Sequence, residues 1–464
     1  MAVPELASTT LVELSKVIER REASPEDVTR AYLERIEALD KRVNSYITVA
    51  ADAALAQARR AGEEMAKGQR RGPLHGAPIG LKDLYLTKGL RTTAGSKILA
   101  DWVPDEDAHV VSLLGEAGAI TLGKLNMHEW AAGGTTINPH YGPTRNPWDL
   151  ERIPGGSSGG SGAAVAAGLC AAALGSDTAG SIRIPSSLCG IVGLKPTYGL
   201  CSLRGVLPLS WSLDHVGPMS RTVADCALLL EAIAGPDPND PYSAGRQAGA
   251  YSDGLERGVR GLRIGLPKNY FFDNTDAEVE AAVRQAAKVL ESEGARIVEI
   301  EVPAVEETQA VGLPVLVAEA HAYHQAYLKE RAGDYGEDVL ALLRAGETIL
   351  SADYINAQRA RVDYARRLES VYADVAVLIS PTTVVPAATI ESCLREPPTM
   401  ILIQNTAPFN LGGLPALSVP CGFTKGGLPI GLQVAGRRFD EATVLRVGVA
   451  YEAATDWSKR RPPL

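Results

Sequence analysis

A glycine-rich stretch without charges constrains this chain more than any other feature of its sequence. From Ile153 to Ser176 no charged residue occurs. Ten glycines fall within 155–193, at positions 155, 156, 159, 160, 162, 168, 175, 180, 190 and 193. At the average of about 7%, a segment of that length holds only about three glycines. Because glycine exposes its backbone N–H groups and accepts positive φ angles, the segment suits the binding of an anion or an oxyanion.

Composition places the chain among folded proteins. Its 464 residues are 45% hydrophobic and 22% charged, which excludes a disordered chain. The net charge of −9 argues against nucleic acid or an anionic membrane as a partner. The uncharged stretch is rich in Gly, Ala and Ser instead of Leu, Ile and Phe, so no membrane span is expected there.

The cysteine pattern and the first residues bear on the compartment. Scattered cysteines without a CxxC pair favour free, mostly buried thiols in a reducing environment. Residues 1–13 lack a basic region followed by an apolar run, so no signal peptide is expected. We therefore expect a cytoplasmic protein. The six cysteines are Cys170, Cys189, Cys201, Cys226, Cys393 and Cys421.

Helical and extended patterns alternate along most of the chain. The first 65 residues look helical, with a capping box at Thr10 and Glu13. Beyond them, the short apolar runs 76–82, 119–123 and 171–175 alternate with helix-like segments such as 108–117 and 162–168. Strands and helices in alternation predict an α/β sheet, and no long linker divides the chain.

The glycine run leaves several interpretations open. A phosphate-binding P-loop requires a lysine after the glycines, and none follows. The residues around Ser158 match the GxSxG elbow of α/β-hydrolases, but the preceding Arg-Ile-Pro-Gly-Gly is a poor strand. A purely structural glycine loop also fits such a run. A further interpretation joins the run to the lysine in Gly80-Leu81-Lys82-Asp83.

Joined to Lys82, the run resembles the amidase signature family of serine hydrolases. Its two signature segments are Gly-Gly-Ser-Ser-Gly-Gly-Ser around Ser157 and Asp-Thr-Ala-Gly-Ser-Ile-Arg-Ile-Pro, which contains Ser181. The spacing agrees, because 75 residues separate Lys82 from Ser157 and 24 separate the two serines. The resemblance spans roughly residues 8–456. Further matching motifs lie at 123–127, 142–148, 193–197, 213–218, 410–415 and 431–433.

The resemblance implies a Ser-Ser-Lys triad, with Ser181 as nucleophile, Ser157 as bridging serine and Lys82 as base. A serine hydroxyl needs a neighbouring base, and a lysine serves only where burial or nearby positive charge keeps it neutral. The apolar run before Lys82 predicts that it ends a buried strand. In the family the bridging serine follows a cis peptide bond, here Gly156–Ser157. The resemblance implies no metal and no organic cofactor.

Backbone groups and supporting side chains complete the implied site. Ser158 is expected to support the loop through hydrogen bonds, and Asp177 and Arg183 are expected to form an ion pair. Many relatives carry glycine at the position of Ala179, a change that a negative φ tolerates. The implied oxyanion hole consists of the backbone N–H groups of Thr178, Ala179, Gly180 and Ser181.

The resemblance also implies a fold and a reaction. The fold is α/β, a single large domain over 1–464 with a central mixed β-sheet covered by helices on both sides. Within it we expect an N-terminal helical region at about 8–65 and the signature core at about 75–225. The expected reaction is hydrolysis of the C–N bond of small linear amides, with carbamates, ureas or esters as further substrates. The expected state is a monomer or homodimer.

The main alternative within the family is the A subunit of a glutamyl-tRNA amidotransferase, which hydrolyses glutamine to supply ammonia to a partner subunit. Such relatives hold glutamine with an acidic residue before the Asn-Leu pair and an arginine on an earlier helix. Here 397–409 contains no acid, and Ala341 and Leu342 stand near the arginine position with Arg344 slightly offset. An apolar wall leaves the charges of a zwitterion unpaired, so the sequence favours a stand-alone amidase with an apolar pocket.

A catalytically inactive paralogue used as a binding scaffold is the non-enzymatic alternative. Three intact catalytic positions count against it. His321 and His324 have the spacing of helical metal ligands, but no third ligand is evident, so a half-exposed helix face is the simpler interpretation. Cys189 has no histidine close to it in the sequence, and a packed thiol is expected there.

Overall fold

A mixed β-sheet of eleven strands forms the centre of the computed structural model, which describes residues 6, 7 and 9–464. The strand order is β1-β3-β2-β6-β8-β7-β12-β13-β11-β9-β10. A separate pair consists of β4 (Ile137–Asn138) and β5 (Gly142–Pro143). The sheet strands are β1 (Tyr46–Val49), β2 (Pro78–Lys82), β3 (Ile120–Leu125), β6 (Ala172–Ser176), β7 (Val192–Lys195), β8 (Val216–Ser220), β9 (Arg263–Pro267), β10 (Arg296–Ile300), β11 (Val377–Pro381), β12 (Ala416–Phe423) and β13 (Pro429–Gly436).

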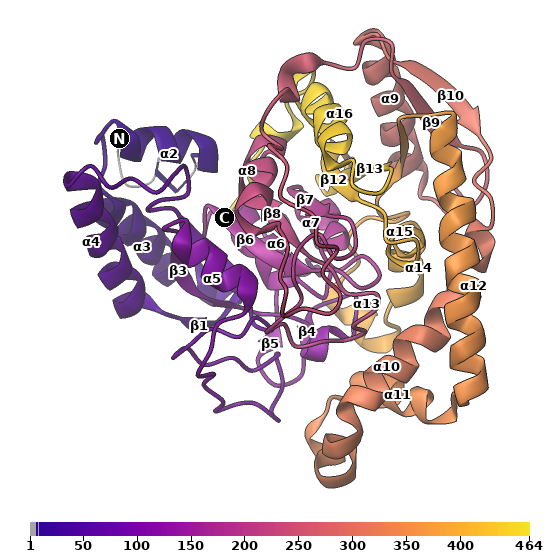
Figure 1. The fold of residues 1–464 in the computed structure, drawn as a ribbon, viewed down its shortest axis with the longest axis horizontal. Coiled ribbons are helices and arrows are strands. Elements are labelled where there is room, and N and C mark those ends of the chain that lie inside the picture. The colour runs from indigo at the N-terminus through magenta and orange to yellow at the C-terminus, as the bar shows by residue number, and fades with distance from the viewer. Residues whose placement is uncertain (1–5, 8) are drawn as a thin grey trace.

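Helices flank this sheet, and the predicted α/β class with a mixed sheet is confirmed (Figure 1). Strands β2, β3 and β6 run parallel, whereas β6 pairs antiparallel with β8. The α-helices are α2 (Leu11–Glu19), α3 (Pro25–Val43), α4 (Ala51–Ala66), α5 (His109–Glu116), α6 (Gly159–Ala167), α7 (Arg183–Cys189), α8 (Val223–Ile233), α9 (Ala277–Ser292), α10 (Thr308–Arg331), α11 (Glu337–Ala345), α12 (Ser351–Ser370), α13 (Ile390–Arg395), α14 (Thr399–Ile403), α15 (Ala407–Leu411) and α16 (Glu441–Ala453).

The N-terminal region departs from the wholly helical segment that the sequence predicted at about 8–65. The capping box at Thr10 and Glu13 is present, and α2 begins directly after it. Asn44 ends α3 in the left-handed conformation, and the Tyr-Ile-Thr-Val segment that follows forms β1 on the edge of the sheet. Aromatic and β-branched residues favour a strand here. Of residues 1–13, in which no signal peptide is expected, residues 1–5 and 8 lie outside the described part of the chain.

Close backbone packing explains much of the glycine run. Helix α6 is buried along its whole length and lies beside α7 near the middle of the molecule (Figure 1). It begins at Gly159, earlier than the predicted start at Gly162, and a Cβ on Gly160 would lie 2.2 Å from the carbonyl oxygen of Asn126. We expected these glycines to let backbone approach a ligand. At Gly160 the neighbour is the backbone of the protein itself.

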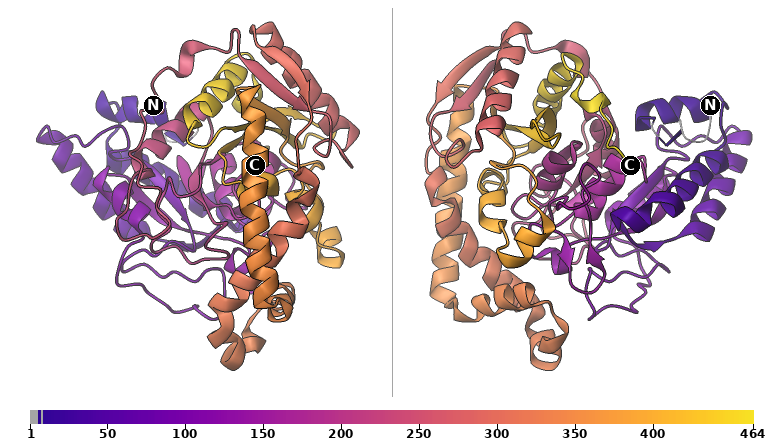
Figure 2. Two further views of the ribbon diagram at one scale, coloured as in Figure 1. Left: turned by 45° about the vertical axis from the view of Figure 1, so that its right-hand side comes forward. Right: turned by 180° about the vertical axis from the view of Figure 1, so that it is seen from behind.

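The later part of the chain adds a layer of long helices. Helices α10 and α12 pack along each other, and α11 packs on α10, at one side of the molecule (Figures 1 and 2). Helix α15 contacts both α10 and α12, which brings the segment around 407–411 under this layer. No helix of the described residues is long and apolar enough to cross a membrane.

Candidate active site

The carboxyl ends of β2 and β6 bring the predicted base to the glycine-rich loop. Lys82 is the last residue of β2 and Ser176 the last residue of β6, and parallel neighbouring strands end at the same edge of a sheet. Lys82 Nζ lies 2.7 Å from Ser157 Oγ and 2.8 Å from Ser176 Oγ. The Lys82 side chain is fully buried. The lysine therefore contacts two hydroxyl groups in a site closed to bulk water.

Burial changes the charge state of this lysine. Removal of the ammonium group from water lowers the pKa of Lys82 to about 7, and the nearby carboxyl groups of Asp214 and Asp177 only partly oppose this effect. A substantial fraction of Lys82 is therefore neutral at neutral pH. A neutral amine at this position can accept a proton from the Ser157 hydroxyl across the 2.7 Å contact.

The backbone before and after the Ser157 side chain contacts a neighbouring loop. The Gly156–Ser157 bond is cis, and the Ser157 carbonyl oxygen accepts a hydrogen bond from the backbone N–H of His128 at 3.0 Å. A Cβ on Gly156 would lie 2.8 Å from the backbone nitrogen of Thr135. The loop around 128–135 thus presses against the peptide that presents the Ser157 hydroxyl.

Ser181 lies in the loop between β6 and α7, where the resemblance placed the nucleophile. Its side chain is 8% exposed, whereas Ser157 is fully buried. The Ser181 carbonyl oxygen accepts a hydrogen bond from the Ser158 N–H at 3.2 Å, which joins the two serine-bearing segments. Ser158 Oγ in turn donates to the Ser176 carbonyl oxygen at 3.1 Å. Ser158 follows a loop and no strand, so the GxSxG elbow does not describe this segment.

The backbone of this loop presents free donors. Within the described chain, no hydrogen-bond acceptor pairs with the backbone N–H groups of Thr178, Ala179, Gly180 and Ser181. Gly180 has φ +139°, and a Cβ there would lie 2.2 Å from Thr406 Oγ1. Ala179 has a negative φ, so the alanine causes no backbone strain. We call residues 177–181 the oxyanion loop, because the resemblance predicts the oxyanion hole there.

A buried ion pair holds the oxyanion loop against α7 and β13. Arg183 Nε and Nη2 donate to the two carboxylate oxygens of Asp177, each at 3.0 Å, and both side chains are fully buried. The same guanidinium donates to Gln433 Oε1 at 2.7 Å and to Asn410 Oδ1 at 2.6 Å. Burial alone would raise the pKa of Asp177, but the Arg183 guanidinium holds it well below its usual range.

An apolar cavity opens beside the oxyanion loop. Its walls come from the loop and from α10, α14 and α15, and none of its lining side chains is ionisable. It is not lined by the residues near which we sought a glutamine-binding arginine, namely Ala341, Leu342 and Arg344. The lining residues are Thr178, Ala179, Leu213, Thr308, Gln309, Gly312, Leu313, Leu316, Met400, Ile403, Ala407, Asn410 and Leu411.

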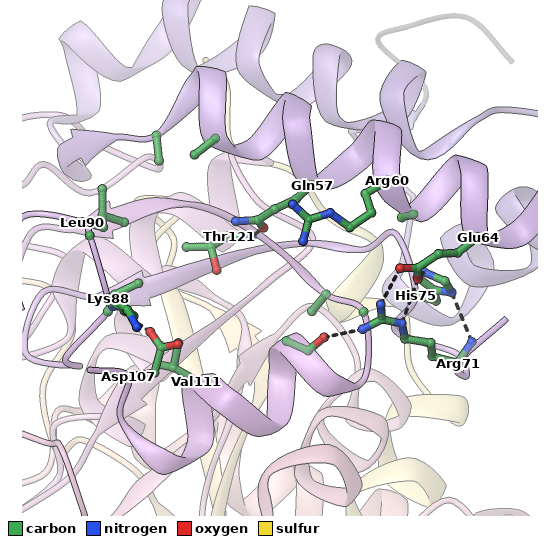
Figure 3. Close-up of a pocket in the computed structure, with 18 residues that line it drawn as sticks. Gln57, Arg60, Glu64, Arg71, His75, Lys88, Leu90, Asp107, Val111 and Thr121 are labelled. Carbon is green, nitrogen blue, oxygen red and sulfur yellow. Dashed lines mark hydrogen bonds and ion pairs between the residues drawn. The ribbon is translucent and has the colours of Figure 1, made fainter. Parts of the chain in front are cut away.

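A second cavity, of about 330 Å³, lies between α4, α5 and β3 and contains none of the predicted site residues (Figure 3). Charged side chains line it. At one end Glu64 accepts hydrogen bonds from Arg71 at 2.6 and 2.8 Å and lies 3.2 Å from His75. Its Arg60 side chain is exposed to solvent.

The histidine pair and Cys189 lie outside the candidate site. No group of three potential metal-binding side chains occurs in the described part of the chain. His324 is fully buried, which corrects the expected half-exposed face, because its ring packs 4.5 Å from that of Trp130 and bonds to the Tyr335 hydroxyl at 2.8 Å. Cys189 is a buried free thiol, and burial raises its pKa.

Sequence reasoning missed several partners of the site. Ser176 contacts Lys82, Asp214 binds Thr178, and Thr406 donates to the Ala179 carbonyl oxygen. Asp214, Asn410 and Gln433 stood in matching motifs without an assigned role. A signal existed for Ser176, because it ends the apolar run that precedes Asp177. The motif around Asp214 did not reveal its contact with Thr178, and no local pattern links Thr406 to the loop.

Comparisons with known proteins agree over nearly the whole chain. The family model described as Amidase matches residues 27–445. A Moorella thermoacetica protein, named as the A subunit of glutamyl-tRNA(Gln) amidotransferase, is 45% identical, and the match covers 99% of each chain. Peptide amidase from Stenotrophomonas maltophilia has 35% identity, a TM-score of 0.86 and 98% coverage of each chain.

A further solved structure belongs to a protein complex. It is described as a vestigial protein complex that reveals the evolutionary origins of an s-triazine catabolic enzyme. Its chain is 37% identical, has a TM-score of 0.91, and the match covers 96% of this chain and 98% of that one.

Proposed function

The chain belongs to the amidase family, and we propose that it hydrolyses the C–N bond of an amide through an acyl-enzyme on Ser181. The observation that carries this proposal is the fully buried Lys82, whose Nζ lies 2.7 Å from Ser157 Oγ beside a loop with unpaired N–H groups. A buried, partly neutral lysine next to a hydroxyl is the arrangement that activates a serine nucleophile.

The reaction begins with two proton transfers. Ser181 Oγ gives its proton to Ser157 Oγ, and Ser157 gives its own proton to neutral Lys82 Nζ, while Ser181 Oγ bonds to the amide carbon. The negative charge on the carbonyl oxygen is stabilised by backbone N–H groups of the oxyanion loop. Each such donor contributes about 3–4 kcal/mol to transition-state stabilisation in comparable sites.

Collapse of the tetrahedral intermediate breaks the C–N bond. The leaving nitrogen takes a proton that returns from Lys82 through Ser157, and it departs as ammonia or an amine. Water then attacks the acyl-enzyme by the same relay, which releases the carboxylic acid and restores Ser181. Each proton that is taken up in one half-reaction is returned in it.

Two substrate classes remain, and different observations support them. The names of full-length relatives favour the amidotransferase A subunit over the stand-alone amidase that the sequence favoured. In that case the substrate is glutamine and the chain works with partner subunits instead of as a monomer or homodimer. The complex in which a structural neighbour was solved is also in line with a partner.

The lining of the apolar cavity supports the other substrate class, the neutral amides of a stand-alone amidase. Glutamine carries an α-ammonium and an α-carboxylate group, and burying either without a partner of opposite charge is costly. The cavity offers no ionisable side chain to either group. A neutral acyl group of modest size fits such walls, in line with the likeness of the fold to a peptide amidase.

The test of the reaction compares three variants with a matched control. We expect Ser181→Ala, Ser157→Ala and Lys82→Met each to abolish release of 4-nitroaniline from a short neutral acyl 4-nitroanilide. Ser292→Ala, an exposed serine of α9, leaves the rate unchanged. Equal rates in the wild type and Ser181→Ala would contradict the proposal.

The test of the substrate measures ammonia release from glutamine in parallel. Activity on the anilide alone supports the neutral acyl substrate. Ammonia release from glutamine by the isolated chain, or only after addition of candidate partner subunits, supports the amidotransferase.

Six buried free thiols are in line with a reducing compartment, and we propose a cytoplasmic location.

A further inference from the structure

A buried carboxyl group outside the predicted triad binds the oxyanion loop. Asp214 Oδ1 accepts a hydrogen bond from Thr178 Oγ1 at 2.6 Å. Its other oxygen accepts from the backbone N–H groups of Leu209 at 2.9 Å and Ser210 at 3.1 Å. Only 6% of Asp214 is exposed, so these groups replace the water that a carboxylate normally binds.

The contact between Asp214 and Thr178 lies next to the N–H groups that are proposed to stabilise the oxyanion. Thr178 opens the row of unpaired N–H groups in the oxyanion loop, and its side chain also lines the apolar cavity. On the other side of the loop, Thr406 donates to the Ala179 carbonyl oxygen. The loop is thus held at two neighbouring residues by side chains from distant parts of the sequence.

We propose that Asp214 is a positioning residue for the hydrolysis, in which its carboxyl group fixes the Thr178 side chain and thereby the N–H groups of the oxyanion loop. The inference rests on the proposed function. It assigns Asp214 no contact with the substrate. Through Thr178, the carboxyl group keeps the loop donors aimed at the site where the oxyanion forms.

A second consequence concerns the charge of Asp214. Its carboxylate favours the protonated form of Lys82, and burial raises the pKa of Asp214 itself to about 7. The other ionisable groups that influence it are Glu319 of α10 and the hydroxyls of Tyr85 and Tyr198. Asp214 also lines a cavity together with Arg204 and Asp240.

The test uses a fluorophosphonate, which reports on the nucleophile without a known substrate. Ser181 Oγ attacks phosphorus, a P–O bond forms, fluoride leaves, and the hydroxyl proton passes to Lys82. We measure the phosphonylation rate against pH for the wild type, Thr178→Val, Thr178→Ser and Asp214→Asn. Thr29→Val is the matched control, because it also removes a buried hydroxyl, one for which the described residues provide no partner.

The expected results separate the hydrogen bond from the charge. Thr178→Val lowers the maximal rate by about tenfold or more, since displaced donors stabilise the oxyanion poorly. Thr178→Ser retains the hydroxyl and most of the rate, and Thr29→Val reacts like the wild type. Asp214→Asn keeps only one acceptor oxygen, so its amide nitrogen faces either Thr178 or the N–H groups of Leu209 and Ser210, and it removes a negative charge near Lys82. The rising limb of its pH profile therefore moves to lower pH.

The outcomes also distinguish this inference from the proposed function. If the wild type and Ser181→Ala are labelled equally, the proposed function is wrong. If Ser181 is labelled but Thr178→Val reacts at the wild-type rate, the positioning role of Asp214 is wrong. An unshifted limb in Asp214→Asn overturns the effect of its charge on Lys82. Urea unfolding midpoints establish that each variant is folded, and Thr178→Val keeps the test decisive if Asp214→Asn does not fold.

Discussion

We expect the environment of the Lys82 side chain to set the pH range of the proposed reaction. Burial lowers its pKa to about 7 from the ordinary value of 10.5, and only the neutral amine accepts a proton from Ser157. We therefore expect kcat/KM for a neutral amide to rise with pH through a limb near pH 7 and then level off. The check is a pH–rate profile from about two pH units below that limb to about two above it. A rate independent of pH across that interval would contradict this assignment of the base.

The Arg183 side chain is expected to matter more for folding than for contact with substrate. Arg183→Met leaves the Asp177 carboxylate buried without its cation, and loss of one partner of a buried pair costs about 3–5 kcal/mol. Urea unfolding of the variant measures this loss. Arg366→Met, which removes an exposed pair with Asp363, serves as the control and is expected to change stability little. Equal unfolding midpoints for the two variants would contradict the bracing role.

Single residues were predictable where they stood in recognisable motifs. Lys82, Ser157 and Ser181 were identified from motifs that resemble the amidase signature family, and the structure brings Lys82 and Ser157 into contact. Their catalytic roles stay predictions. Asp214 and Thr406 contact the oxyanion loop across 36 and 227 residues of sequence, and such contacts depend on the packing of whole elements. No local pattern reveals them.

At the scale of elements, two helices give a paired prediction about glycine. In α6 a Cβ on Gly160 would lie 2.2 Å from the Asn126 carbonyl oxygen, whereas in α4 a Cβ on Gly62 would meet nothing closer than 3.9 Å. We expect Gly160→Ala to lower the free energy of unfolding by about 1–3 kcal/mol because the contact overpacks the core. Gly62→Ala raises it by about 0.5–1 kcal/mol because alanine favours helix.

Thermal or urea unfolding of both variants measures the difference. A gain in stability for Gly160→Ala would mean that α6 does not approach the 126 segment as closely as described. The opposite signs expected for the same substitution make the comparison independent of general effects of added methyl groups.

Elements with strong local signals were predicted well. Capping residues placed the start of α2, and apolar runs located β2, β3 and β6 within one or two residues. Strand β1 was missed because it is four residues long and lies between two helices. The start of α6 was also placed late, because glycine is a poor helix former and the helix is held by burial.

For the molecule as a whole, the six thiols provide a measure of global unfolding. All six cysteines are free and buried, and burial raises the pKa of Cys170 to about 12. We expect none to react within minutes with a thiol–disulfide exchange reagent at mildly alkaline pH, and all six to react in concentrated urea. Rapid reaction of any thiol in the native protein would show that part of the core opens readily.

The class of the fold was predictable from the alternation of helical and extended patterns, but the order of its strands was not. The order brings β12 next to β7, which joins the two halves of the chain, and β11 next to β9, a strand far from it in the sequence. The walls of the apolar cavity likewise come from α10, α14 and α15 and were foreseen only as an apolar segment. That residues 1–464 form a single domain stays a prediction.

The cavity and the reacting groups derive from different stretches of the chain. The groups proposed to react lie between Lys82 and Ser181, whereas most of the cavity wall lies between Thr308 and Leu411. The residues that bind the acyl group can therefore change in evolution while the reacting groups stay the same. A chimaera that takes its segment of roughly 300–411 from a relative would acquire that relative's preference among acyl groups and keep its own reacting groups, which offers a practical way to redirect such enzymes.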